Sequence, residues 1–219
     1  MFRHLLWKEF LLIGRAKNGL LSLVSLLMAF LFIFHYSLET NTKLEIDSII
    51  GLKWAGIFLL AFVLISQVTY EERESGAYRI TRLYISSHSE FIAKSFVLFF
   101  LLFLVELFLL LLLFLFFEKF YFESSKLIGQ FLYLIPGTLS LSFLGVTLSQ
   151  LSFATRLKEI VLPILLIPLS IPVLLSGMQA ERKYFSSAEI NFPSLIVLFA
   201  FMILYLALGL LIREVGEDI

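Results

Sequence analysis

Ionisable side chains are scarce in this chain, so one that stands inside apolar sequence is the first candidate for chemistry. Of the 219 residues, 60% are hydrophobic and 16% are charged. Glu106 lies within the apolar run "LFLVELFLLL", and a carboxylate inside a membrane is costly enough to be a functional-site hypothesis by default. It marks a polar path or a contact with another subunit, or it is a protonated carboxyl hydrogen-bonded to a neighbouring helix through Gln67 or Gln150.

A second concentration of charge is the stretch "YEERESGAYRITRLYISSHSEF", residues 70–91, which separates two long apolar runs. Gly76 lets the backbone turn, and the apolar residues after it recur at i, i+3, i+6 and i+7, the spacing of one helix face. They are Ala77, Ile80, Leu83 and Tyr84. This spacing predicts a short amphipathic helix along the membrane surface.

The charges of this stretch lie away from the apolar face. Arg79 and Arg82 sit on another side of the predicted helix. Glu71, Glu72 and Glu74 precede it, where negative charge suits the positive end of a helix dipole. Such a helix between two spans could transmit force from a soluble partner into the membrane. The alternative is an ordinary solvated loop.

Composition argues against several classes of function. The formal net charge is zero, which suggests no nucleic-acid partner, and the chain has no cysteine for disulfide or thiolate chemistry. It has no G-x-x-x-x-G-K-S/T stretch whose backbone amides could hold nucleotide phosphates. The sequence identifies no catalytic residue and no metal site.

Membrane helices must position these residues. The mean hydropathy is +0.97, and several apolar runs reach or approach the ~20 residues that cross a bilayer core of roughly 30 Å. We predict an all-α integral membrane protein with six transmembrane helices. The predicted spans are Gly19–Leu38, Gly51–Tyr70, Ile92–Phe117, Leu127–Leu151, Ile160–Leu175 and Ser194–Ile212.

The distribution of Lys and Arg predicts the orientation of these spans. An even number of spans places both termini on one side, and the side richer in Lys and Arg is cytoplasmic. The side that carries both termini and residues 71–90 is richer than the side that carries residues 39–50 and 179–193. We therefore predict cytoplasmic termini and a cytoplasmic loop at 71–91.

Two segments are expected to differ from simple spans. Residues 1–18 place apolar and basic side chains on opposite sides of a helix, which predicts an amphipathic interfacial helix ahead of a six-helix transmembrane domain at 19–219. Three prolines predict a broken fifth span, either kinked or split into a span and a short re-entrant piece. They are Pro163, Pro168 and Pro172. The carbonyls they free need donors from neighbouring helices, polar side chains or water.

Parts of the chain resemble known families. In residues 71–94, Glu72, Glu74, Gly76 and Lys94 hold the places of the acidic entry, turn and lysine around the coupling helix of ABC-2-type exporter permeases. The segment "IPGTLSLSFLGVTLSQLSFATRLKEIVLPILLIPLSIPVLLSG" resembles CcmB, the haem exporter protein B family of cytochrome c maturation. The matching positions are Gly137, Thr138, Phe143, Leu144, Gly145, Leu151, Arg156, Pro168, Ile171 and Pro172. The chain departs from that family inside the coupling helix, where "YRIT" and "ISSHS" replace Leu-Glu and a proline.

The resemblance covers nearly the whole chain and implies a permease of the ABC-2-type exporter fold in the bacterial inner membrane, with no catalytic residues of its own. It implies a separate cytoplasmic ATPase subunit and a haem-handling membrane subunit as partners. It also implies, indirectly, a periplasmic haem chaperone that serves c-type apocytochromes, with haem as candidate cargo. Because such exporters need two permease halves, the chain is expected to pair with a second copy of itself.

Two further features are weighed with this resemblance. Gly137 and Gly145 give the fourth span a small-residue side, for packing within the bundle or at a dimer interface.

Haem iron takes His, Met, Cys or Tyr ligands. His35, at the end of the first span, is a weak candidate ligand, and the alternative is that it is a residue of the membrane interface. If the complex ligates haem, partner chains are expected to supply the iron ligands.

Two other functions stay open. One is an ABC-2 permease for another cargo, such as a lipid, a polysaccharide or a drug. The other is a non-transporting scaffold that relays the motion of an ATPase to a haem-handling partner. Co-purification with the haem-handling membrane subunit and the periplasmic chaperone would favour haem over another cargo.

Overall fold

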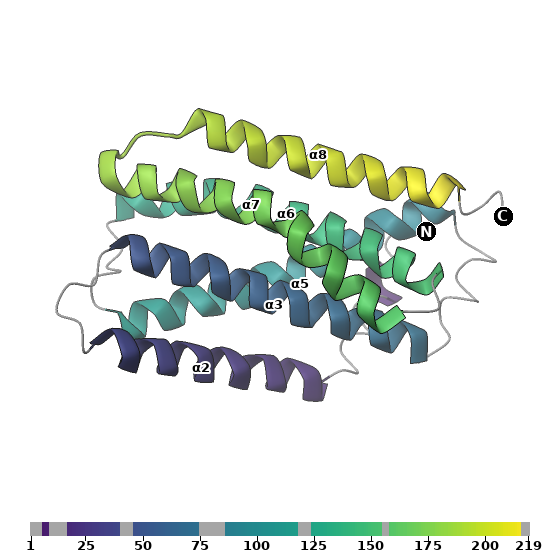
Figure 1. The fold of residues 1–219 in the computed structure, drawn as a ribbon, viewed down its shortest axis with the longest axis horizontal. Helices are drawn as coiled ribbons and strands as arrows, with labels where there is room; N and C mark the ends of the chain where they lie inside the picture. Colours follow the sequence, from purple (N-terminus) through teal and green to yellow (C-terminus); the bar gives the residue numbers. More distant parts are fainter. Residues whose placement is uncertain are drawn as a thin grey trace.

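The computed structural model describes residues 6–8, 17–39, 46–74, 86–117, 124–154 and 158–215. Apart from the first short piece, each part is essentially one long helix, except that 158–215 holds two, and the helices form an up-and-down bundle (Figure 1). They are α2 (Lys17–Glu39), α3 (Ile46–Glu74), α5 (Ser87–Phe116), α6 (Ser124–Ala154), α7 (Lys158–Ser187) and α8 (Phe192–Val215). We call the end at which α3 ends and α5 begins the α3–α5 end. Helix α2 begins there and α8 ends there (Figure 1).

Five of these helices are long and apolar enough to cross a membrane. In α2, the residues with described side chains form a shorter apolar helix, Ser22–Ser37. The predicted all-α membrane class is therefore confirmed, and each of the six predicted spans lies in a helix. The five longer stretches are Ile46–Thr69, Ser87–Phe116, Gly129–Ser152, Leu162–Ser187 and Phe192–Glu214.

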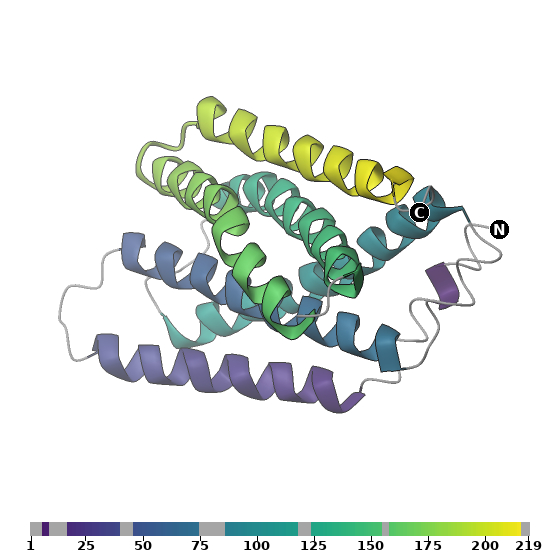
Figure 2. The same cartoon turned by 45° about the vertical axis from the view of Figure 1, so that its right-hand side comes forward.

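Helix α6 lies at the centre of the bundle. It packs against α3, α5, α7 and α8, and 78% of its apolar stretch is buried, compared with 17% for α8. Helix α2 packs against α3 and α5 on the side of the bundle away from α8 (Figures 1 and 2). The side chains that α6 presents to its neighbours therefore decide how closely the bundle packs.

Small residues allow that close packing. A Cβ at Gly145 would lie 2.5 Å from Cδ1 of Ile65, so a larger side chain there would displace α3. Ser140 and Ser142 are also buried, and each donates a hydrogen bond to the carbonyl four residues earlier in α6, at 2.7 and 2.8 Å. Gly137 packs against the ring of Trp54 in α3. Packing within the bundle is therefore the role that the structure gives to Gly137 and Gly145.

Of the two alternatives predicted for the fifth span, helix α7 shows the kinked one and not the split one (Figure 2). It is one uninterrupted helix that contains Pro163, Pro168 and Pro172. It bends near its middle but does not split or re-enter (Figure 2). In the bend, the Tyr205 hydroxyl donates to the carbonyl of Leu169, and the Ser170 hydroxyl donates to that of Ile167. Hydroxyls of a neighbouring helix and of α7 itself thus bond to carbonyls close to the prolines.

The end of α7 differs from the prediction. The fifth span was expected to end at Leu175, but the helix continues for three more turns through polar sequence to Ser187. It ends at Ala188, whose φ of 56° lies in the left-handed region and whose N–H donates to the Tyr184 carbonyl at 2.9 Å. A left-handed residue is a common helix terminator, although glycine usually fills that place.

Two predicted segments lie largely outside the described residues. Of the interfacial helix expected at 1–18, residues 6–8 are described as helical, with Trp7 exposed, and α2 begins at Lys17. The short helix expected after Gly76 lies outside the described residues. The backbone of residues 71–74 forms the last turn of α3, so the three acidic residues of this segment end a long apolar helix.

Candidate functional site

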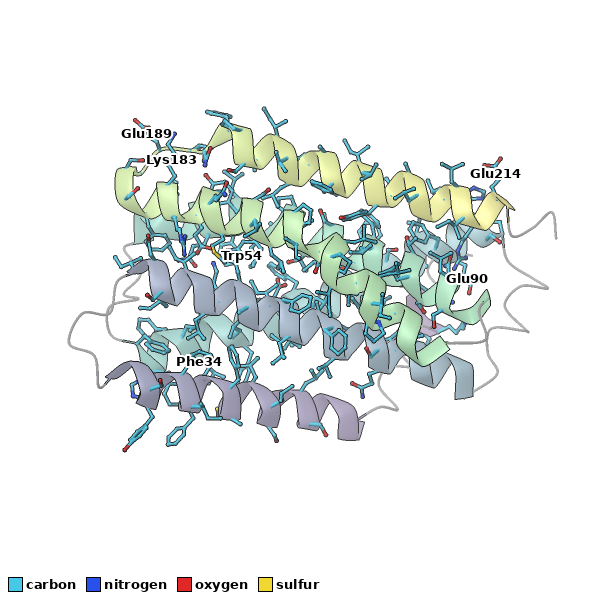
Figure 3. The ribbon with its side chains drawn as sticks, in the orientation of Figure 1. Phe34, Trp54, Glu90, Lys183, Glu189 and Glu214 are labelled. Atoms are coloured by element: carbon cyan, nitrogen blue, oxygen red, sulfur yellow. The ribbon has the colours of Figure 1, made fainter. Side chains whose placement is uncertain are left out.

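Among the described residues, three groups of buried polar side chains that include a charged residue type join helices of the bundle. We call them the Arg213 cluster (Glu90, Lys94, Arg213), the Glu106 pair (Glu106, Thr138) and the Lys53 cluster (Lys53, Trp54, Glu181). Figure 3 shows Glu90 and Trp54 toward opposite ends of the bundle. Charged groups inside a membrane protein need partners and commonly mark function, so these groups are the first places to look for it.

The Arg213 cluster lies at the α3–α5 end. Glu90 is in the first turn of α5 and Arg213 in the last turn of α8, and they are only 2% and 8% exposed. Nη1 of Arg213 lies 3.0 Å from Oε2 of Glu90 and also donates to the backbone carbonyl of Ser87. Nζ of Lys94 lies 2.6 Å from the other carboxylate oxygen of Glu90. Two cations thus hold this carboxylate, and Arg213 fastens the start of α5 to the end of α8.

Apolar packing supports the same contact. A Cβ at Gly209 of α8 would lie 2.2 Å from Cζ of Phe91, so the absence of a side chain there lets α8 approach α5. The guanidinium of Arg213 lies 5.8 Å from the centroid of the Phe91 ring. The ring of Phe143 in α6 stacks on Phe91 with 6.1 Å between centroids. Helices α5, α6 and α8 therefore interlock around Phe91.

A small cavity adjoins the cluster on the side of α3 and α6. Its volume is about 30 Å³, and its polar lining comes from Lys94, Thr69, Ser149 and Gln150. Thr69 Oγ1 donates to Ser149 Oγ at 3.0 Å. A polar cavity of this size can hold a water molecule, but not a macrocycle. Its apolar lining is Ile65, Val68, Val97, Leu98, Gly145 and Val146.

The Glu106 pair joins α5 to α6. Glu106 is fully buried, and its Oε2 lies 2.6 Å from Oγ1 of Thr138. The same hydroxyl lies 2.9 Å from the carbonyl oxygen of Leu134. The carboxyl therefore faces protein, but the partner expected from the sequence was wrong, because the contact goes to Thr138 and not to Gln67 or Gln150.

The Lys53 cluster joins α3 to α7. Nζ of Lys53 donates to one carboxylate oxygen of Glu181, and Nε1 of Trp54 donates to the other at 2.7 Å. The side chains of Lys53 and Glu181 are each 1% exposed. The indole of Trp54 lies against Gly137 of α6 and Gly177 of α7, and a Cβ at Gly177 would lie 2.2 Å from it. One tryptophan thus packs three helices together while its N–H helps to hold a buried carboxylate.

These contacts hold helices in place and do not form a reaction centre. Within the described ranges, no three His, Asp or Glu side chains lie close enough together to hold a metal ion. The ring of His35 packs against Phe116 and Phe117, with 5.5 Å between centroids in each case. This places His35 where α2 meets the end of α5, and its role as a haem ligand stays a prediction.

Comparison with known families gives this arrangement a context. A family model described as "CcmB protein" matches residues 1–212. The chain belongs to the CcmB family. CcmB is a permease family of haem export in cytochrome c maturation, so the chain is a permease component and a multi-pass membrane protein. No curated protein and no solved structure matches the chain.

The CcmB-motif positions are spread over the bundle and do not gather at one site. Gly137 and Gly145 face α3, whereas Pro168 and Pro172 lie in α7. Arg156 lies outside the described residues. The motif therefore records how α6 and α7 pack rather than a single centre of chemistry.

The residues expected to couple to an ATPase are described only in part. Glu71, Glu72 and Glu74 belong by backbone to the last turn of α3. The others lie outside the described residues: Gly76, Arg79, Arg82 and Leu83.

Sequence reasoning named Lys94 through the family resemblance but missed the other residues of the two charged clusters. Lys53 and Arg213 contributed to it only as charges that set the topology. Their partners, Glu181 and Glu90, are 128 and 123 residues away in sequence, so no local pattern links them. One usable signal was the spacing of Gly177 and Glu181, which places a small residue and a carboxylate on one helix face.

Proposed function

We propose that this CcmB-family chain is the transmembrane permease subunit of an ABC transporter complex that handles or exports haem for periplasmic c-type cytochrome biogenesis. A separate cytoplasmic ATPase subunit hydrolyses ATP, and this chain couples that hydrolysis to the membrane complex. The observation that carries the proposal is the family match over residues 1–212. Its partners are the ATPase subunit, the haem-handling membrane subunit, a second copy of the chain and, indirectly, a periplasmic haem chaperone.

Helix lengths support six spans in the bacterial inner membrane. Helix α2 has 23 residues, and at 1.5 Å per residue this length of about 34 Å is sufficient for a bilayer core. With α2 included, both termini and the α3–α5 end lie in the cytoplasm, because that side is richer in Lys and Arg.

The position of residues 71–91 supports a coupling role. Helix α3 leads into this segment and α5 leaves it, so a displacement there acts on two helices at once. Helix α3 packs against α2, α5, α6 and α7 and can pass the displacement on. The coupling residues are Glu71, Glu72, Glu74, Gly76, Arg79, Arg82 and Leu83.

The test combines gene deletion with purification of the complex. Deleting the chain should abolish c-type cytochromes, and the tagged chain should co-purify with the ATPase and with the haem-handling membrane subunit. Normal cytochromes after deletion would contradict the proposal. A lipid or polysaccharide defect in their place would indicate another cargo.

A second arm tests the coupling segment. Gly76→Val should misdirect the short helix, because a β-branched residue tolerates positive φ poorly. Charge reversal at Arg79 and Arg82 should weaken capture of the ATPase in a salt-dependent way. Normal ATPase capture and normal cytochrome yield in all three variants would show that the segment is only a solvated loop.

A further inference from the structure

The Arg213 cluster stands next to the segment that should receive the ATPase. The cluster begins at Ser87, the first residue of α5, and residues 75–85 lie directly before it in sequence. Arg213 reaches this turn from the other end of the chain, with its guanidinium on both the Glu90 carboxylate and the Ser87 carbonyl. Any displacement that enters α5 from residues 75–85 therefore acts first on a turn that α8 already holds.

The contact between α5 and α8 resists separation. Glu90 and Arg213 are almost entirely buried, so pulling them apart without water would leave the Arg213 charge uncompensated in a low-dielectric environment, while Glu90 would keep Lys94. The close packing of the Phe91 ring against Gly209 adds an apolar contact between α5 and α8 to the ion pair. The start of α5 and the end of α8 are thus expected to move as one unit.

The side of the α5 start that faces α3 and α6 contains a small void. There the cavity of about 30 Å³ separates Lys94 and Val97 from residues of α3 and α6. Packed interiors transmit displacement, whereas a void lets neighbouring groups shift. This void leaves room for a small shift of the α5 start against α3 and α6.

We propose that Arg213 and Glu90 are positioning residues that carry displacement of the ATPase-coupling segment from α5 into α8. This inference rests on the proposed function, because it needs an ATPase that acts at the coupling residues, which lie within 71–83, ahead of α5. Helix α8 is suited to such a role, because 17% of its apolar stretch is buried and its buried side packs against α6 and α7, to which it can pass the displacement on.

The test measures movement of α8 in the assembled complex. Spin labels are attached at Phe32→Cys of α2 and Ile203→Cys of α8, two exposed positions in a chain without native cysteine. The distance between the labels is recorded with and without a non-hydrolysable ATP analogue. We expect an ATP-dependent change that Arg213→Met abolishes and that Arg213→Lys, which keeps the positive charge, restores in part.

A functional readout accompanies the distance measurement. Arg213→Met and Glu90→Gln should capture the ATPase normally but lower cytochrome yield about fivefold or more, the lower range of coupling between sites. Lys183→Met and Glu214→Gln change exposed residues of the same charge types and serve as matched controls that should behave as the unmodified chain.

The outcomes separate this inference from the proposed function. If the unmodified chain captures no ATPase or supports no cytochrome, the proposed function fails. If the unmodified complex works and Arg213→Met retains the full movement of α8, the inference is overturned. It is also overturned if neither Arg213→Met nor Glu90→Gln accumulates in membranes, because the cluster is then a requirement for folding and not for transmission.

Discussion

The ion pair between Lys53 and Glu181 shows what a charge requires inside this bundle. Both side chains are removed from solvent, and the second carboxylate oxygen of Glu181 is held by the indole of Trp54. The network satisfies every charge that it buries. The contribution of this network to the stability of the protein therefore depends on all its members being present, because a buried charge that loses its partner is far more costly than a surface charge.

Removing one partner of this pair should destabilise the protein strongly. Lys53→Met leaves the Glu181 carboxylate buried without a cation, and we expect a loss of about 3–5 kcal/mol in the free energy of unfolding. Thermal unfolding in detergent measures it. The double variant Lys53→Met, Glu181→Gln removes both charges and keeps an acceptor for Trp54, so it should recover much of the loss. Lys183→Met, two residues on from Glu181, should have little effect, and equal losses in all three proteins would contradict this account.

Glu106 should matter for function more than for folding. Glu106→Gln keeps an oxygen to accept from Thr138, so the variant should fold. In Glu106→Leu the Thr138 hydroxyl still has the carbonyl of Leu134, and we expect a melting temperature close to that of the unmodified chain with impaired complex assembly or lower cytochrome yield. Assembly, yield and melting temperature are measured in the same strains. A Glu106→Leu chain that is both stable and fully active would leave this carboxyl without a role.

At the scale of the helix, the end of α7 offers a stabilising substitution. Ala188 adopts φ of 56°, and a left-handed conformation costs a residue with a Cβ roughly 1–2 kcal/mol. Ala188→Gly should relieve most of that cost and raise the melting temperature. Ala180→Gly, inside the same helix, is the matched control and should lower stability, because glycine weakens a helix interior. A melting temperature unchanged or lowered by Ala188→Gly would contradict the assignment of strain.

Helix α7 also shows how far local sequence could predict this fold. Apolar runs located all six helices, because the length of an apolar run is a local property. The end of α7 was misplaced because Glu181, Arg182 and Lys183 resemble a loop in composition. Their helix continues since Glu181 finds its cation on α3, a contact that depends on the fold and not on neighbouring residues. The prolines indicated a kink, which α7 has (Figure 2), but they could not indicate that the helix continues through it.

The candidate site could be predicted only where one residue was anomalous in its own surroundings. Glu106 stood out inside an apolar run, and its burial follows from that position. Its partner Thr138 could not be chosen from the sequence, because several polar residues of neighbouring spans were equally suitable. Of the Arg213 cluster only Lys94 stood out, through its resemblance to a family position. Glu90 and Arg213 did not, because they sit near helix ends, where charges are ordinary.

At the scale of the whole molecule, the two ends of the bundle should face opposite sides of the membrane. Cysteine introduced at Ser86, an exposed residue at the α3–α5 end, should react only after the membrane is permeabilised. Cysteine at Ser187, exposed at the opposite end, should react with an impermeant reagent in intact cells. The native chain gives no background, because it contains no cysteine. Strong external labelling at position 86 would reverse the topology.

The hydroxyl groups of α6 affect how this helix enters the membrane during synthesis of the chain. Helix α6 is synthesised before α7 and α8, two of the helices that bury it, so its polar face meets the bilayer during biosynthesis before those neighbours exist. Ser140, Ser142 and Thr147 already donate to carbonyls of their own helix, and a hydroxyl bonded in this way needs no partner from a later helix. A chain truncated after Ala154 should therefore integrate into membranes as fully as the complete chain, as measured by resistance to alkaline extraction. Extraction of the truncated chain would show that the membrane integration of α6 depends on the helices that follow it. Retention of the truncated chain would mean that α6 is already in the membrane when α7 and α8 leave the ribosome, and that these two helices assemble on its surface.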